Sequence, residues 1–252
     1  MYCTRCDSAS VLITRVLVFA CAVKAEELVN FRFPVFLDLT GEKCLVTGEG
    51  YEIPAKVQAL VDAAAVVTYV NPTADPRIQM LAESGAVSWH RRKFQPGDLA
   101  DCFLVITDQD DNSEVFRFAE DQRVLCNAVD DPQNCRFSFG SVHRQGDLTI
   151  AISTNGWAPA LAVRLRQKLE REIGCEYGDL LDLLKEIRPE ITSRIPDFTT
   201  RRDLWYQIVD SDVLSLLREG LRSEAKARVD QLLKGALSNT LHSDTSGDAG
   251  DR

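Results

Sequence analysis

The sequence predicts an α/β protein: a parallel sheet wound in strand–helix–strand units, followed by a helical region. Two observations carry this prediction. Between residues 44 and 152, short apolar runs of strand type alternate with stretches in which apolar residues recur at helical spacing. Beyond residue 159, the helical spacing continues alone. Strands that alternate with helices are typical of a parallel sheet, because a crossover helix returns the chain to the start of the next strand.

The first half of the chain supplies the sheet. Pro54 suits the first turn of a helix, where its missing N–H costs nothing. The apolar face of that helix is expected at Val57, Leu60, Val61 and Ala64. Further helices are expected over residues 76–84 and from Asn112 or Ser113 to about Gln122. The strands are expected at residues 44–47, 66–70, 87–90, 103–106, 124–129 and 148–152.

The second half is predicted to be helical. Pro159 opens a helix whose apolar stripe contains Leu161, Leu165 and Leu169. The remaining helices are expected over residues 177–187, 199–209, 211–219 and 223–237. Residues 238–252 are rich in Ser, Asp and Gly, so we expect a disordered tail there.

Composition disfavours several classes of function. The 252 residues are 45% apolar and 27% charged, as in soluble globular proteins, and can form one large domain or two small ones. A net charge of −9 disfavours a nucleic-acid partner, which would require a basic surface. The eight cysteines are scattered and several lie in apolar runs, which indicates reduced thiols rather than disulfides. No second cysteine pair follows Cys3 and Cys6, so we expect no metal site.

Residues 1–30 are expected to be a disordered leader. The apolar run from Val11 to Val23 contains Arg15 and is too short to span a bilayer. Ala20-Cys21-Ala22 is a weak cleavage-like site, so a signal peptide is the alternative. We expect a cytoplasmic protein without a membrane partner, because the chain beyond Phe31 has the pattern of an intracellular enzyme.

Gly48-Glu49-Gly50, between a strand and a helix, is the first half of a dinucleotide-binding turn. The first glycine permits the tight turn, and the second lets a pyrophosphate approach the backbone at the helix N-terminus. Two features count against nucleotide binding: Ile53 replaces a small residue, and Asn71 follows the second strand where an acidic residue is expected. A plain strand–helix turn is the alternative.

Asp130 is the candidate for catalysis, because it follows a predicted parallel strand whose carboxyl end faces the ligand crevice. Alternatively, Asp130 and Asp131 only begin a turn before Pro132. Ser153-Thr154-Asn155-Gly156 can line an anion site, although a capped turn is favoured. His143 is expected to be structural. Several cations can serve a polycarboxylate ligand: Arg136, Arg144, Arg164, Arg166 and Lys168.

In order along the chain, these segments resemble those of the precorrin-2 dehydrogenase family, also called the siroheme synthase N-terminal module. The resemblance is best over residues 31–171 and looser in the helical remainder. It is carried by Phe33-Pro34-Val35-Phe36-Leu37-Asp38-Leu39, Gly48-x-Gly50, Lys56, Asn127-x-Val129-Asp130-Asp131-Pro132, and Leu148-Thr149-Ile150-Ala151-Ile152-Ser153-Thr154-x-Gly156-x-x-Pro159-Ala160-Leu161-Ala162.

The resemblance implies a Rossmann-type NAD-binding domain at residues 31–142, a short dimerisation segment at 143–173 and a small helical domain at 174–237. It implies a homodimer that oxidises precorrin-2, a tetrapyrrole, to sirohydrochlorin with NAD as cofactor. Some family members also insert ferrous iron as a second substrate. We expect no methyltransferase domain in this chain.

The resemblance also assigns the site. The family's important aspartate falls on Asp130, as a base or as an anchor for the macrocycle. Cofactor contacts are implied for Gly48, Glu49, Gly50, Tyr51, Glu52, Ile53, Asn71, Pro72, Thr107 and Asp108. Substrate contacts are implied for Asn127, Ser153, Thr154 and Gly156.

The chain departs from the family pattern around the turn. Glu49 replaces the middle of three glycines, and its charge is expected to weaken NAD binding unless it points away from the pyrophosphate. Thr107-Asp108-Gln109 stands where Ala-Ala-Thr is usual. Asn155 and Ala158 replace a glycine and a serine. These changes leave an alternative open: a non-catalytic module that binds a tetrapyrrole or nucleotide, or a chelatase only.

Overall fold

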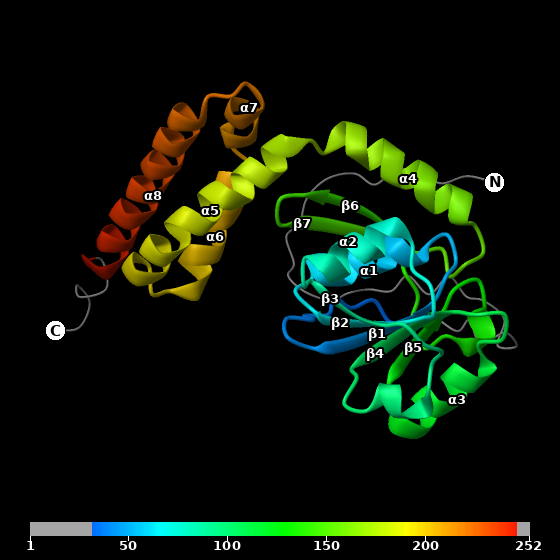
Figure 1. The fold of residues 1–252 in the computed structure, drawn as a ribbon. Coiled ribbons are helices and arrows are strands. Elements are labelled where there is room, and N and C mark those ends of the chain that lie inside the picture. Colours follow the sequence, from blue (N-terminus) through cyan, green and yellow to red (C-terminus); the bar gives the residue numbers. More distant parts are fainter. Residues whose placement is uncertain (1–31, 246–252) are drawn as a thin grey trace, which may run out of the picture. The chain divides into compact units, whose positions relative to one another are not determined.

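The computed structural model describes residues 32–245, of which those from Phe36 onward form one compact unit (Figure 1). Its main feature is a five-stranded, fully parallel sheet in the order β3-β2-β1-β4-β5. This confirms the predicted α/β fold class. The strands are β1 (Lys43–Gly48), β2 (Val66–Val70), β3 (Val87–His90), β4 (Leu104–Asp108) and β5 (Leu125–Ala128).

Helices cover both faces of the sheet, since successive residues of a strand point to opposite sides. Cys44 and Val46 of β1 pack in the cluster that includes α1 (Ile53–Asp62) and α2 (Pro76–Glu83), whereas Leu45 packs with α3 (Ser113–Gln122). Figure 1 shows α1 and α2 on one face and α3 on the other. Strands buried on both faces lack polar alternation, which explains why the continuous apolar runs marked them correctly.

The strand order reverses at β1, which pairs with β2 on one side and β4 on the other. In open parallel sheets, ligands bind outside the carboxyl ends of the strands at such a reversal. The register places Gly48, the last residue of β1, beside Asp108, the last residue of β4. The predicted glycine turn therefore lies at the reversal point.

An antiparallel hairpin follows the sheet. It consists of β6 (Ser141–Gln145) and β7 (Leu148–Ile152). The sequence predicted β7 but missed β6, because Val142 is the one aliphatic residue in that segment and its neighbours are polar. His143 of β6 is buried, and its Nε2 lies 2.9 Å from the carbonyl oxygen of Ile173, as expected of a structural histidine.

The helical region has its own core and corrects two predicted boundaries. The helix expected to end at Ile187 continues through Pro189 to Arg194, because Ile187 and Ile191 are both buried. The tail expected to be disordered from Ser238 is helical to Thr245, since no glycine or proline interrupts it before Gly247. The helices are α4 (Pro159–Glu172), α5 (Cys175–Arg194), α6 (Phe198–Val209), α7 (Val213–Arg218) and α8 (Arg222–Thr245).

The predicted leader, residues 1–30, and the end of the predicted tail, residues 246–252, lie outside the described residues, as do Cys3 and Cys6. Within residues 32–245, no helix is long and apolar enough to cross a membrane. Five cysteines in this part of the chain are not joined in disulfides: Cys44, Cys102, Cys126, Cys135 and Cys175. The expectation of reduced cysteines stays a prediction.

Candidate active site at the carboxyl edge of the sheet

Gly48 closes β1 in a backbone conformation that other residues rarely adopt, with φ at 103°. A methyl group on Gly48 would lie 2.1 Å from the backbone oxygen of Asp108 on the neighbouring strand. The buried hydroxyl of Tyr69 donates a hydrogen bond of 2.6 Å to the Gly48 carbonyl oxygen. Both the turn conformation and its position against β4 therefore require glycine here.

Gly50 is confined by a side chain instead. A methyl group on Gly50 would lie 1.5 Å from Oδ2 of Asp108, so the Asp108 carboxylate packs directly against the turn. The pKa of Asp108 is raised, first by burial and then by the nearby carboxylates of Asp130 and Glu52, while Lys56 acts in the opposite direction. Three carboxylates from separate segments thus gather beside the glycine turn.

Glu49 points away from that group. Its Oε2 accepts a hydrogen bond of 2.5 Å from the hydroxyl of Thr73, and Nδ2 of Asn71 lies 3.5 Å from the same oxygen. Asn71 also donates to the Thr73 carbonyl oxygen at 3.0 Å. The loop after β2 therefore holds the Glu49 carboxylate to one side of the turn, the orientation in which its charge interferes least with a pyrophosphate.

The N-terminus of α1 has no side-chain cap at its N-cap residue, Glu52, and no acidic residue occupies its first turn. The Ile53 N–H donates to the Gly50 carbonyl oxygen at 3.1 Å and Pro54 has no N–H, so only part of this terminus can donate to an anion. Glu52 instead pairs with Lys56 at 3.0 Å, and Lys56 Nζ lies 4.1 Å from the centre of the Phe139 ring. Uncapped backbone N–H groups at a helix N-terminus bind anions, because they combine free donors with the positive end of the helix dipole.

The turn fits a dinucleotide through its backbone. The strand, the two close-packed glycines and the N-terminus of α1 are those of a pyrophosphate cradle. The side chain that opposes the fit is Asp108, whose carboxylate must rotate or be protonated when a pyrophosphate approaches Gly50. The predicted cofactor residues Tyr51 and Pro72 are exposed near this edge.

Two predicted cofactor residues serve the fold through their side chains. Ile53 is fully buried in the main core, so the helix accommodates it rather than being displaced. The buried hydroxyl of Thr107 donates to Oδ1 of Asn112 at 2.9 Å, which organises the loop after β4. Both residues are fully buried, so cofactor contact by them stays a prediction.

Asp130 follows β5 at the same edge of the sheet, with φ at 55°. Its side chain is exposed, and no hydrogen bond or ion pair to it occurs within residues 32–245. Asp131 behaves differently: its Oδ2 accepts a hydrogen bond of 2.6 Å from Nδ2 of Asn134 in the following turn. Asp131 therefore shapes the turn, while the Asp130 carboxylate is available to a ligand. A left-handed backbone at a non-glycine residue is common at functional sites.

The predicted substrate residues make local contacts. Asn127 is buried and donates to the Phe137 carbonyl oxygen at 2.9 Å, holding the segment after β5. The hydroxyl oxygen of Ser153 accepts from the backbone N–H of Asn155 at 3.2 Å, and that of Thr154 from Ala158 at 3.3 Å. Gly156 has φ at 82°, in keeping with the capped turn that the sequence favoured. Substrate contact by these four residues stays a prediction.

Sequence reasoning missed Thr73 and Phe139, and noted Lys56 only as part of the family resemblance. Thr73 lies 24 positions from Glu49, and no local pattern connects them. The pairing of Lys56 with Glu52 was detectable, because residues four apart on a helix are neighbours.

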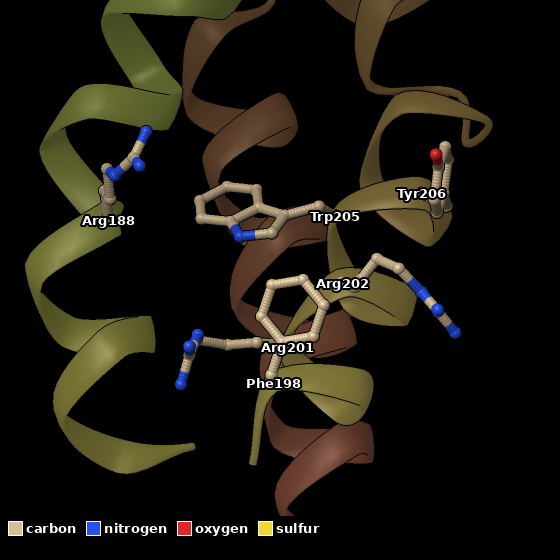
Figure 2. Close-up of a pocket in the computed structure, with 6 residues that line it drawn as sticks. All are labelled: Arg188, Phe198, Arg201, Arg202, Trp205 and Tyr206. Carbon is tan, nitrogen blue, oxygen red and sulfur yellow. The ribbon is translucent and has the colours of Figure 1, made fainter. Parts of the chain in front are cut away.

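A second feature lies in the helical region (Figure 2). An open cavity of about 380 Å³ is formed between α5 and α6, and Figure 2 shows Trp205 of α6 extending toward the side of α5 that carries Arg188, with the Phe198 ring below Trp205 in this view. Phe198 and Tyr206 are 68% and 63% exposed. Arginine and aromatic side chains of this kind are enriched at protein interfaces. The cavity is lined by Arg188, Phe198, Arg201, Arg202, Trp205 and Tyr206.

Three protein-family models match the chain in succession. Residues 35–141 match a putative NAD(P)-binding family, residues 145–172 a sirohaem biosynthesis protein central family, and residues 176–233 a sirohaem synthase dimerisation region. The first match identifies the parallel-sheet domain as one of NAD(P)-binding type. The third places a dimerisation region over α5 to α8, which includes the cavity in Figure 2.

Similar curated proteins are siroheme synthases. The chain is 33% identical over 204 residues to siroheme synthase 1 of Serratia proteamaculans and 34% identical over 205 residues to siroheme synthase of Actinobacillus pleuropneumoniae. These alignments cover 80% of this chain but 43% and 42% of the relatives, so the chain spans less than half their length.

The fold is similar to that of a solved structure. SirC, a precorrin-2 dehydrogenase, superposes with a TM-score of 0.66 and 23% identity, over 79% of this chain and all of that one. At this identity the superposition supports the architecture.

Proposed function

We propose that the chain belongs to the precorrin-2 dehydrogenase family, the N-terminal module of siroheme synthases, and that it oxidises precorrin-2 to sirohydrochlorin with NAD. One observation carries the proposal: Asp130, the aspartate of the family motif, is exposed and unengaged within the described part of the chain, at the sheet edge that also holds the glycine turn. A nucleotide cradle and a carboxylate at one edge are what such an oxidation requires.

The chain's own groups have two tasks, to hold the cofactor and to assist the loss of a proton. The backbone of Gly48 and Gly50 and the N-terminus of α1 hold the pyrophosphate. Precorrin-2 loses two electrons and two protons: NAD, when bound, accepts the hydride, and the second proton leaves to a base. Asp130 accepts that proton, or holds the macrocycle so that the proton leaves to solvent.

Partner and location extend the proposal. The match to a dimerisation region and the exposed Phe198 and Tyr206 support a homodimer formed through α5 to α8. The five described cysteines form no disulfide with one another, which supports a reducing compartment, and we assign the chain to the cytoplasm. We propose an NAD-binding domain at residues 31–142, a dimerisation segment at 143–173 and a helical domain at 174–237. β6 crosses the first of these boundaries.

Ferrous iron insertion is the second candidate activity. Asp108 favours it, because a carboxylate packed against Gly50 opposes NAD binding while the Asp130 side chain stays exposed. In that reaction Asp130 accepts protons from pyrrole nitrogens, and iron is a substrate. A binding module without catalysis is supported by the same feature of the turn.

The test is turnover of precorrin-2 by the purified chain, with and without NAD and ferrous iron. Asp130→Ala is expected to reduce dehydrogenation by about 10²–10⁴-fold while leaving the melting temperature and NAD affinity nearly unchanged, because positioned acid–base groups contribute about that factor. Asp131→Ala is the matched control. It is expected to reduce turnover far less, because Asp131 contacts Asn134 in its own turn.

Each outcome has a consequence. Parent-like turnover by Asp130→Ala would remove Asp130 from the mechanism. If the parent protein shows no NAD-dependent oxidation but inserts iron into sirohydrochlorin, the chelatase activity is established instead. A parent protein that binds sirohydrochlorin and catalyses neither step would establish the binding module.

A further inference from the structure

The end of β2 lacks the residue that normally reads the ribose of a dinucleotide. In this class of fold, an acidic side chain near the end of the second strand accepts hydrogen bonds from the adenosine ribose. Here β2 ends at Val70, and Asn71 follows. An amide carries no charge with which to repel the 2′-phosphate of NADP.

Glu49 supplies a carboxylate at that place from a different segment. Its Oε2 accepts from the Thr73 hydroxyl at 2.5 Å and lies 3.5 Å from Nδ2 of Asn71, so the loop after β2 fixes one carboxylate oxygen. Glu49 is exposed, and no residue in the described part of the chain donates to its Oε1. The second oxygen remains available for a ligand hydroxyl.

The surrounding charges also disfavour a phosphate. Arg77, on α2 just beyond this loop, is the type of side chain that accommodates a 2′-phosphate in NADP-binding proteins. It is instead paired with Asp75 through two hydrogen bonds, at 2.9 and 3.1 Å. Glu49 and Asp75 both act on Tyr69, whose pKa is raised to about 12, chiefly by burial and then by these two carboxylates.

We propose that Glu49 binds the adenosine ribose of NAD and makes the site select NAD over NADP. The inference rests on the proposed function, because it requires that a dinucleotide lies over the Gly48–Gly50 turn. Within that function, Glu49 is a specificity-determining residue that replaces the missing acid at the end of β2, and Thr73 positions it.

The test compares the dissociation constants of NADH and NADPH, measured by nucleotide fluorescence with the full chain. The parent is expected to prefer NADH by at least about tenfold. Glu49→Gln is expected to weaken NADH binding by about tenfold, the equivalent of one hydrogen bond to a charged group, and to abolish most of the preference. Thr73→Val is expected to act in the same direction with a smaller effect, because it releases the Glu49 carboxylate.

Glu42→Gln is the matched control. Glu42 is exposed and precedes β1, at the opposite edge of the sheet, so this variant removes the same charge and is expected to keep the parent preference. If Glu49→Gln and Thr73→Val both melt like the parent and keep its preference for NADH, the inference is overturned while the proposed function stands. If the parent binds neither nucleotide, the cofactor of the proposed function fails as well.

Discussion

Gly48→Ala is predicted to destabilise the sheet domain severely, for two reasons that add. A left-handed or similarly rare backbone costs a residue with a Cβ about 1–3 kcal/mol, and Gly48 has φ at 103°. The new methyl group would also lie 2.1 Å from the backbone oxygen of Asp108. That neighbour belongs to β4 and cannot rotate away, so the strands must separate locally.

The cost of separating them is that of an overpacked core, about 1–3 kcal/mol, and includes the hydrogen bond from Tyr69 to the Gly48 carbonyl oxygen. The sum is about 2–6 kcal/mol, against a total stability of roughly 5–15 kcal/mol for a typical domain. For a chain of this size, the midpoint is expected to fall by roughly 10 °C. Urea unfolding followed by circular dichroism measures the loss directly.

Gly50→Ala is the control, because there the obstructing atom belongs to a flexible side chain. The Asp108 carboxylate can rotate away from the new methyl group, so we expect a loss of no more than about 1.5 kcal/mol. Removing that carboxylate in Gly50→Ala/Asp108→Ala should restore most of the loss. Equal losses for Gly48→Ala and Gly50→Ala would refute the reasoning, because the rigid and the flexible neighbour would then be indistinguishable.

Two further predictions concern pH. The raised pKa of Asp108, caused first by burial, means that its charged form weakens the fold as the pH rises through the folded-state pKa. Asp108→Asn should therefore raise the melting temperature at pH 7 by on the order of 1–2 °C, a gain that disappears below about pH 4. The pKa of Glu176 is lowered, chiefly by its hydrogen bond from Arg218, so its contribution is lost as the pH falls through the folded-state pKa. Glu176→Gln should lower the midpoint of thermal unfolding by on the order of 2 °C at pH 7 and by progressively less below about pH 4. For either variant, a difference from the parent that does not change with pH would contradict the pKa shift assigned to that residue.

The sheet was predictable because its signals are local. Three of the strands, residues 66–70, 87–90 and 148–152, have the predicted bounds, and a fourth, residues 125–128, lies within the predicted 124–129. Runs such as Val66–Val70 are rich in β-branched residues, which marks them as strands. β6 was not predictable, because a mostly polar segment becomes a strand only through its antiparallel partner. The end of α8 was missed for the opposite reason: a polar composition was taken for disorder, although neither glycine nor proline occurs between Ser238 and Gly247.

The positions of Gly48 and Asp130 at the sheet edge could be predicted from sequence, because both are defined by the end of a strand. Their surroundings could not, since the decisive contacts join distant segments. Glu49 looked harmful to a pyrophosphate, but Thr73, far along the chain, holds its carboxylate aside. Such a contact depends on the packing of the loop after β2 against the turn, which no spacing rule describes.

The negative charge that opposes the cofactor therefore comes from Asp108. Its carboxylate packs against Gly50, and its raised pKa shows that burial and the charges of Asp130 and Glu52 already disfavour its ionised form. An approaching pyrophosphate adds further negative charge, and so must favour protonation or rotation of the same side chain. NAD binding by this chain therefore depends less on the altered glycine turn than on Asp108, at the end of the neighbouring strand. Its carboxylate must be protonated or rotate away before the pyrophosphate can approach Gly50.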